Sequence, residues 1–328
     1  MWGVAPHTLP GPGRSAFELL DALGADGGPR AMLLFGSNPV VSAPDADRVR
    51  DRLASLDLLV AADFVLSETA ALADVVLPVA QWAEESGTMT NLEGRILRRA
   101  KAVEPPEGVR TDLEVLADLA VRLGQPAARF PTDPDTVLAE LGRASAGGAA
   151  DYSGATPQRL ADGEALYWPV RANGEPTPRL FLDRFAHPDG RARLVPVAHR
   201  PPAETTDEDY PLIATTGRLM GHYQSGAQTR RVPELTDAEP EAYVEVHPDT
   251  AARAGLAHGD WARLTSRRGR TRARVRLTPA ARLDTVFVPF HFAGDQAANN
   301  LTNPALDPTS RMPEFKVSAV RLEPEPSP

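Results

Sequence analysis

The chain has 328 residues, of which 42% are hydrophobic and 24% charged, a composition and length typical of a globular protein of about two domains. Its net charge of −9 argues against nucleic acid or an anionic membrane as the main partner. The chain has no cysteine, so it cannot by itself form a disulfide, a thiolate metal site or a cysteine-held iron–sulfur cluster. No apolar run approaches the roughly 20 residues that a membrane helix needs, and we expect a cytoplasmic protein.

The first third of the chain alternates helix-like and strand-like segments. Capping boxes at Ser15–Glu18 and Thr111–Glu114 predict helices that run to Leu23 and about Leu123. Between them we expect strands at 31–35, 56–61 and 74–79, and helices at 44–53 and 67–73. Such alternation with short connections is typical of a parallel sheet with helices on its faces. We therefore expect an α/β domain over residues 1–125.

The middle of the chain is poor in regular patterns. Between residues 126 and 207 Pro, Gly, Ala and Asp dominate, and we interpret this range as a connecting region. Within it, residues 180–185 and 192–197 have apolar runs that predict isolated strands.

The last third of the chain has strand-like patterns. We expect strands at 212–216, 243–247, 260–266, 270–277, 285–290 and 316–322, with a short helix at 248–254 that begins with proline. In the fourth of these strands Arg272, Arg274 and Arg276 alternate with apolar residues, so one face should be wet. Many strands with few helices predict a β-barrel over residues 208–325.

Two turns follow predicted strands of the parallel sheet, where α/β folds place their ligands. Gly36–Pro39 offers a close backbone approach and the amide of Asn38, and Asp63 offers a carboxylate that can accept two hydrogen bonds from a ring such as guanine. Taken alone, each turn is more simply explained as an ordinary loop or helix cap.

A third loop, Thr216–Arg231, combines hydroxyls, glycines and guanidinium groups. These groups suit phosphate and pterin edges, and a solvated loop would not need so many glycines and hydroxyls together. Elsewhere the sequence contains no familiar catalytic motif, and its seven histidines lack metal-ligand spacing. We therefore assign neither a catalytic residue nor a metal ligand in this chain.

Several segments of the sequence resemble a known family, the prokaryotic molybdopterin oxidoreductases. The resemblance rests on segments that keep family order, and the form of Tyr223–Gln228 is most similar to assimilatory nitrate reductases. The segments are Gly36–Pro39, Asp63–Pro78, Trp82–Gly87, Thr90–Arg95, Thr216–Leu235, Val246–Pro248, Gly255–Asp260, Pro289–Phe290, Asn299–Thr302 and Phe315–Lys316.

The resemblance implies the C-terminal portion of such an enzyme. Its third domain would be α/β, and its last domain a double-psi β-barrel that binds a molybdopterin dinucleotide. Molybdenum would be held by two molybdopterin guanine dinucleotides, and Asp63 would select guanine. Position 85, where related periplasmic enzymes have Lys, is Glu85. The implied cofactor-binding residues are Asn38, Asp63, Asp112, Thr216, Gly217, Arg218, His222, Ser225, Phe290, Asn299 and Lys316.

The same family opens with cysteines for a [4Fe-4S] cluster, which this chain does not contain. We expect a fragment, a truncated product or one chain of a split enzyme, inactive alone and completed by a separate N-terminal iron–sulfur chain. The implied parent reaction is reduction of nitrate to nitrite. The alternatives are a formate dehydrogenase of the same superfamily and a non-catalytic cofactor-binding module.

Overall fold

The structure is a computed structural model that describes residues 5–8 and 10–325. It divides into two compact units. The barrel unit comprises Arg14–Leu77 and His199–Pro328, and the hairpin unit comprises Met1–Gly13 and Pro78–Ala198. These units do not coincide with the three ranges expected from the sequence, because residues 14–77 share a unit with the barrel. No described helix is long and apolar enough to cross a membrane.

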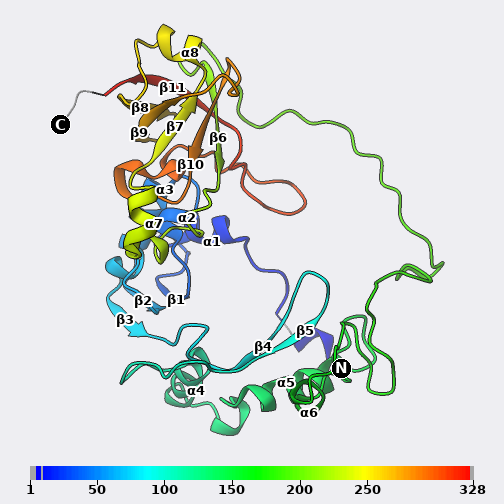
Figure 1. The fold of residues 1–328 in the computed structure, drawn as a ribbon. Coiled ribbons are helices and arrows are strands. Elements are labelled where there is room, and N and C mark those ends of the chain that lie inside the picture. The colour runs from blue at the N-terminus through cyan, green and yellow to red at the C-terminus, as the bar shows by residue number, and fades with distance from the viewer. Residues whose placement is uncertain (1–4, 9, 326–328) are drawn as a thin grey trace. The chain divides into compact units, whose positions relative to one another are not determined.

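The first part of the barrel unit is a small α/β layer (Figure 1). Its strands β1 (Ala31–Phe35), β2 (Leu58–Asp63) and β3 (Val75–Pro78) form a sheet in that order, and β1 and β2 are parallel. The helix α1 (Ala16–Ala22) precedes β1, and the helices α2 (Pro39–Ser42) and α3 (Ala46–Ala54) lie between β1 and β2 in sequence. One apolar cluster joins sheet and helices: Leu20, Leu23, Val40, Ala43, Val49, Leu53 and Leu59.

The second part is a closed barrel of six strands in the order β10-β6-β11-β8-β9-β7. They are β6 (Leu212–Gly217), β7 (Tyr243–Val246), β8 (Trp261–Ser266), β9 (Arg270–Leu277), β10 (Thr285–Pro289) and β11 (Ser318–Pro324). The pairs β6–β10 and β7–β9 are parallel, whereas β11 is antiparallel to β6 and β8. The helices α7 (Pro233–Ala238) and α8 (Pro248–Arg253) lie on its connections.

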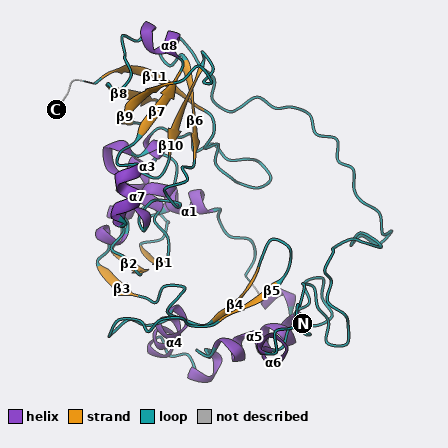
Figure 2. Ribbon diagram, viewed as in Figure 1, coloured by secondary structure: helices purple, strands orange, loops and turns teal. Residues whose placement is uncertain are grey.

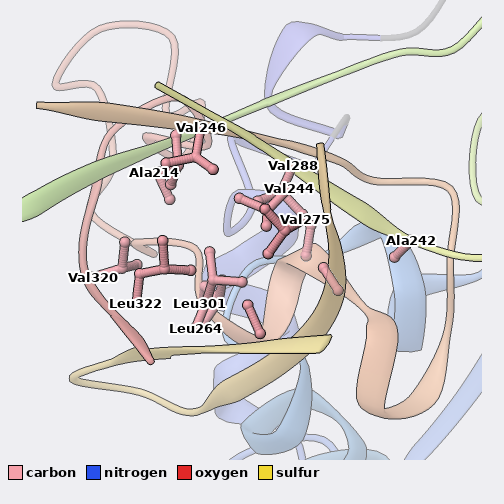
Figure 3. Close-up of a cluster of buried hydrophobic side chains, with 14 of the residues drawn as sticks. Ala214, Ala242, Val244, Val246, Leu264, Val275, Val288, Leu301, Val320 and Leu322 are labelled. Atoms are coloured by element: carbon pink, nitrogen blue, oxygen red, sulfur yellow. The ribbon is translucent and has the colours of Figure 1, made fainter. Parts of the chain in front are cut away.

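The barrel interior is filled by alanine, valine and leucine side chains (Figure 3). They include Ala214, Val244, Val246, Leu264, Val275, Val288, Leu301, Val320 and Leu322, all nearly inaccessible to solvent. Alternation along β9 fixes which residues point inward: Ala273 and Val275 are buried, while Arg274 and Arg276 lie outside over Trp261 and Tyr243. Burying each large side chain stabilises the fold by roughly 1.5–3 kcal/mol, so the inward set holds the barrel closed.

The hairpin unit contains a two-stranded antiparallel sheet, β4 (Gly87–Thr90) with β5 (Ile96–Arg99). Its helices are α4 (Asp112–Arg122), α5 (Pro134–Ser145) and α6 (Pro157–Ala161), drawn as coils in Figure 2. A separate apolar cluster stabilises it, with Leu138, Leu160, Leu166 and Val170 buried beside Ile96.

The predicted fold class, a parallel-sheet α/β region followed by a β-barrel, is confirmed. Both capping boxes are present, and the helices they begin end within a residue of the predicted positions. The isolated strands predicted at 180–185 and 192–197 are wrong, because both ranges are turns or irregular chain with exposed apolar side chains and no pairing partner. The connecting region also contains α5 and α6.

Candidate functional site

The barrel unit encloses a cavity of about 1360 Å³. Pockets for small ligands typically have volumes of roughly 300–1,000 Å³, so this one has room for a larger molecule. Its walls are the turns after β1 and β2, the loop after β6, residues 200–203 and the loop 306–317. Of the residues implied by the resemblance, eight line it: Asn38, Asp63, Thr216, Arg218, Ser225, Phe290, Asn299 and Lys316.

The turn after β1 brings backbone to the cavity. Gly36 has a φ of +54°, which favours glycine, and a Cβ at this position would meet no atom within 4 Å. Asn38 is buried, and its Oδ1 accepts hydrogen bonds from Thr69 N (3.1 Å) and Thr69 Oγ1 (2.8 Å). The amide therefore has a fixed orientation at the cavity wall.

Asp63 ends β2 and presents its carboxylate at the cavity wall. One oxygen accepts from Phe64 N at 2.9 Å and the other from Ser67 Oγ at 2.8 Å. Each carboxylate oxygen has two lone pairs, so each can accept one further hydrogen bond. Two parallel donors of a ligand would find both oxygens already oriented.

The loop after β6 begins at Thr216, whose Oγ1 donates to the Phe315 carbonyl at 3.0 Å. In return, Lys316 Nζ donates to the Thr216 carbonyl at 2.5 Å. Gly217 does not line the cavity, and a Cβ there would lie 2.4 Å from the Phe287 ring. The glycine is thus needed for close packing inside the barrel unit.

Two cations face the cavity beside the Phe290 ring. The Arg218 guanidinium lies 5.4 Å and the Lys316 ammonium 5.9 Å from the ring centroid. Burial, and then the positive charge of Arg218, hold the pKa of Lys316 below its ordinary value. Among the described residues neither cation has a carboxylate within 4.0 Å, although Lys101 and most arginines elsewhere do. Arg218 and Lys316 can therefore bind an anion together, and we call this pair of cations the anion seat.

Asn299 lines the cavity, but its amide is bound within the protein. Its Nδ2 donates to the Val41 carbonyl at 2.6 Å, and its Oδ1 accepts from Thr302 Oγ1 at 3.0 Å. This contact ties the barrel to α2. Asn299 can thus shape the cavity wall through its position.

His222 does not line the cavity. It is buried, with Nδ1 3.1 Å from Thr229 Oγ1 and Nε2 2.9 Å from the Glu239 carbonyl. Both ring nitrogens are therefore hydrogen-bonded within the chain, and the ring stabilises the loop after β6 without lining the cavity. Its predicted contact with a cofactor stays a prediction.

Asp112 belongs to the hairpin unit, where it is the first residue of α4. The residues that line the cavity all belong to the barrel unit. Burial, and then the charge of Glu85, raise the pKa of its carboxyl above the ordinary value. Glu85 itself pairs with Arg99 at 3.0 Å. The role of Asp112 in cofactor binding stays a prediction.

Three residues that do not line the cavity, Glu68, Arg230 and His291, contact the loops that do, and the sequence analysis assigns none of them an individual role. Glu68 pairs with Arg230 at 2.6 Å, and His291 is fully buried with both ring nitrogens hydrogen-bonded to loop backbone. A sequence signal existed for Arg230, which lies in the loop rich in cations. None existed for His291, one of seven scattered histidines.

Two family models match the chain. Residues 11–122 match the model described as molybdopterin oxidoreductase, and residues 212–319 match the molydopterin dinucleotide binding domain. The first covers the sheet and turns that carry Asn38 and Asp63, and the second covers the barrel that carries Thr216 and Lys316.

Curated relatives include the assimilatory nitrate reductase catalytic subunit of Bacillus subtilis, which is 41% identical over 99% of this chain and 46% of its own length. The F420-dependent formate dehydrogenase 1 subunit alpha of Methanococcus maripaludis is 38% identical over 90% of this chain and 43% of its own length. The chain thus spans about half the length of the curated relatives it matches.

Among solved structures, acetylene hydratase from Pelobacter acetylenicus aligns with a TM-score of 0.68 over 93% of this chain and 46% of that chain. At 21% identity this likeness shows a shared fold. The two family models and the curated relatives agree with it, and the chain belongs to the molybdopterin oxidoreductase family.

Proposed function

We propose that the cavity of the barrel unit binds a molybdopterin guanine dinucleotide, and that the chain is the dinucleotide-binding part of a molybdenum oxidoreductase that reduces nitrate to nitrite. The observation that carries the proposal is the cavity itself, because it combines the Asp63 carboxylate, two cations with no carboxylate within 4.0 Å among the described residues, and a volume of about 1360 Å³. Each feature matches one part of such a ligand.

The anion seat fits a diphosphate. Arg218 and Lys316 repel each other, and bringing a phosphate between them would replace that repulsion by charge-assisted hydrogen bonds. Phe290 beside them adds an apolar surface for a flat ring. The residues present therefore fit the anionic part of the cofactor.

The oriented carboxylate of Asp63 fits guanine, which offers two neighbouring donors, N1-H and the 2-amino group. Adenine offers no such pair, so the site should discriminate between the two bases. When bound, the cofactor's molybdenum would supply the two-electron redox chemistry, whereas this chain's side chains bind and orient the dinucleotide.

Titration calorimetry on the full chain with GDP and ADP as probes tests this proposal. We expect GDP to bind at least tenfold more tightly than ADP, and Asp63→Asn to abolish that preference. Asp57→Asn is the matched control, since Asp57 is an exposed carboxylate of the same unit that pairs with Arg30. Equal affinity of the unaltered chain for both nucleotides would contradict the assignment of a guanine site.

The reaction of the whole protein is a separate part of the proposal. We propose that the chain alone is inactive, since it has no cysteine to hold an iron–sulfur cluster, and that a second polypeptide carrying that cluster completes the enzyme. Dye-linked assays of the chain alone should show no nitrate reduction. Turnover by the isolated chain would refute the need for a partner.

Formate oxidation is the second candidate, favoured by the M. maripaludis relative at 38% identity. Assays of the completed enzyme with nitrate and with formate distinguish the two reactions. If neither substrate reacts while GDP still binds, the chain is a non-catalytic cofactor-binding module. The cytoplasmic location expected from the sequence stays a prediction.

A further inference from the structure

A polar network inside the barrel unit joins the loop after β2 to the loop after β6. Glu68 is its centre: one carboxylate oxygen accepts from Arg230 Nη2 at 2.6 Å and the other from Asn38 Nδ2 at 2.7 Å. A second contact runs parallel to it, from Arg231 Nη2 to the Leu66 carbonyl at 2.6 Å. Both loops contribute residues to the cavity lining, and they are therefore linked by residues that do not line it themselves.

We infer that Glu68 and Arg230 are positioning residues of the nucleotide site. Their ion pair holds the Asn38 amide and the backbone at Ser225, and so sets the spacing between the turn after β1 and the loop after β6. The identity of the ligand in the cavity rests on the proposed function, whereas the effect of the ion pair on the conformation of the two loops does not.

The Asn38 side chain shows how the pair acts. Its Oδ1 accepts two hydrogen bonds from Thr69, so its Nδ2 must be the atom that faces Glu68. The second proton of Nδ2 points to Ser225 Oγ at 3.4 Å. Glu68 thus fixes an amide that reaches from the α/β layer to the loop after β6.

Arg230 carries the other half of the link. Its Nη2 also lies 3.4 Å from the Ser225 carbonyl, and its Nε donates to the His291 carbonyl at 3.1 Å. A Cβ at Gly226 would lie only 2.8 Å from that Nε, so the guanidinium passes directly against the loop backbone. One side chain therefore contacts Glu68, the Ser225 carbonyl and the His291 carbonyl at once.

An ordinary ion pair is the simpler explanation, and exposed pairs contribute only about 0–1 kcal/mol. The Glu68 and Arg230 side chains are 28% and 24% exposed, however, and both carboxylate oxygens are bound. Burial disfavours ionisation of Glu68, but hydrogen bonds from Arg230 and Asn38 hold the pKa of its carboxyl below the ordinary value. Because Asn38 and Ser225 both line the cavity, loss of the ion pair should change the conformation of the cavity wall first.

The test uses Glu68→Gln and, as a matched control, Glu325→Gln. Glu325 forms a two-contact pair with Arg263 in the same unit, with similar exposure, and does not line the cavity. Hydrogen–deuterium exchange of loops 36–42 and 218–229 is measured on the full chain, together with GDP affinity and melting temperature.

For Glu68→Gln we expect amide exchange at least fivefold faster in both loops and GDP affinity at least fivefold weaker. Glu325→Gln should lower the melting temperature without changing either loop. Unchanged exchange in Glu68→Gln would overturn the inference, and would show the pair to be solely structural. Absence of GDP binding by the unaltered chain refutes the proposed function alone, since loop exchange still decides the role of the pair.

A second variant covers the case in which Glu68→Gln fails to fold. Arg230→Lys keeps the positive charge but cannot contact Glu68 and the His291 carbonyl with a rigid fork. We expect it to accelerate exchange at 223–229 about threefold. Exchange equal to that of the unaltered chain would again overturn the inference.

Discussion

The buried imidazole of His291 lies against Gln224, whose carbonyl oxygen is 2.6 Å from its Nδ1. On the other side of the ring, Nε2 accepts a hydrogen bond from Leu219 N at 2.8 Å. Nδ1 must therefore carry the proton, and the neutral ring is hydrogen-bonded to the loop after β6 at two positions, Leu219 and Gln224. Gln224 lines the cavity and has a φ of +49°, a conformation that such a clamp helps to maintain.

His291→Phe should keep the ring volume and lose both hydrogen bonds. Leaving a buried amide and a buried carbonyl without partners costs about 1–3 kcal/mol for each group, so we expect a clear loss of stability. Urea denaturation of the full chain measures it. A variant as stable as the unaltered chain would show that water replaces the ring nitrogens.

Protonation of His291 should have a related effect. Burial lowers the pKa of His291 below the ordinary value of 6.5, and a second ring proton would in addition face the Leu219 amide. The stability that this neutral ring contributes is therefore fully present above about pH 6.5 and is lost as the pH falls toward the lowered pKa. We expect melting temperature to fall more steeply between about pH 7 and 5 in the unaltered chain than in His291→Phe. Parallel curves for the two proteins would contradict this assignment.

Gly226→Ala should damage the same loop by a different route. Gly226 has a φ of +73°, and its Cβ would lie 2.2 Å from the His291 carbonyl oxygen. Gly255 has a φ of +70° with no atom within 4 Å of its Cβ, so Gly255→Ala suffers backbone strain alone, roughly 1–2 kcal/mol. Gly226→Ala should lose more than that, and weaken GDP binding as well. Equal losses for the two variants would mean that the loop relaxes freely.

Local signals explain why much of the fold was predictable. The Ser15 and Thr111 capping boxes are short motifs whose partners lie three residues away. In β9, the alternation of arginine with apolar residues directly indicates which side chains are buried. Apolar runs at 180–185 and 192–197 misled, because strand formation depends on a pairing partner that local sequence does not specify.

The resemblance indicates candidate ligand-binding residues, but it gives no signal for residues that act through a neighbour. Among the residues that the resemblance implies, Asn38 and Lys316 line the cavity, whereas His222 and Gly217 do not, and the cofactor contacts of all four stay predictions. The contact between Glu68 and Arg230 joins residues 162 positions apart. Only the assembled barrel unit brings them together, so no sequence spacing could indicate the pair.

Lys316 should give GDP binding a characteristic pH limb. Its pKa is lowered by burial and by Arg218, so it loses its proton at a lower pH than the ordinary value of 10.5. GDP affinity should therefore fall in alkaline solution before free lysines titrate, and Lys316→Met should weaken binding at neutral pH while flattening that limb. Guanosine, which has no diphosphate, is the control ligand: it should show only the alkaline fall caused by loss of its own N1 proton, and Lys316→Met should leave that fall unchanged. A pH profile unchanged by Lys316→Met would exclude the ammonium from the anion seat.

The hairpin unit offers a prediction independent of the cavity. The pKa of Asp112 is raised by burial and by the negative charge of Glu85. Glu85→Gln removes that charge, so the Asp112 carboxyl should ionise at a lower pH, as followed by carbon NMR titration of its carboxyl signal. Glu84→Gln is the control, because Glu84 accepts from Gln81 N and is not a cause of the Asp112 shift. If both variants leave the Asp112 titration where it was, burial alone raises it, and the acidic residue at position 85 has no electrostatic influence on the start of α4.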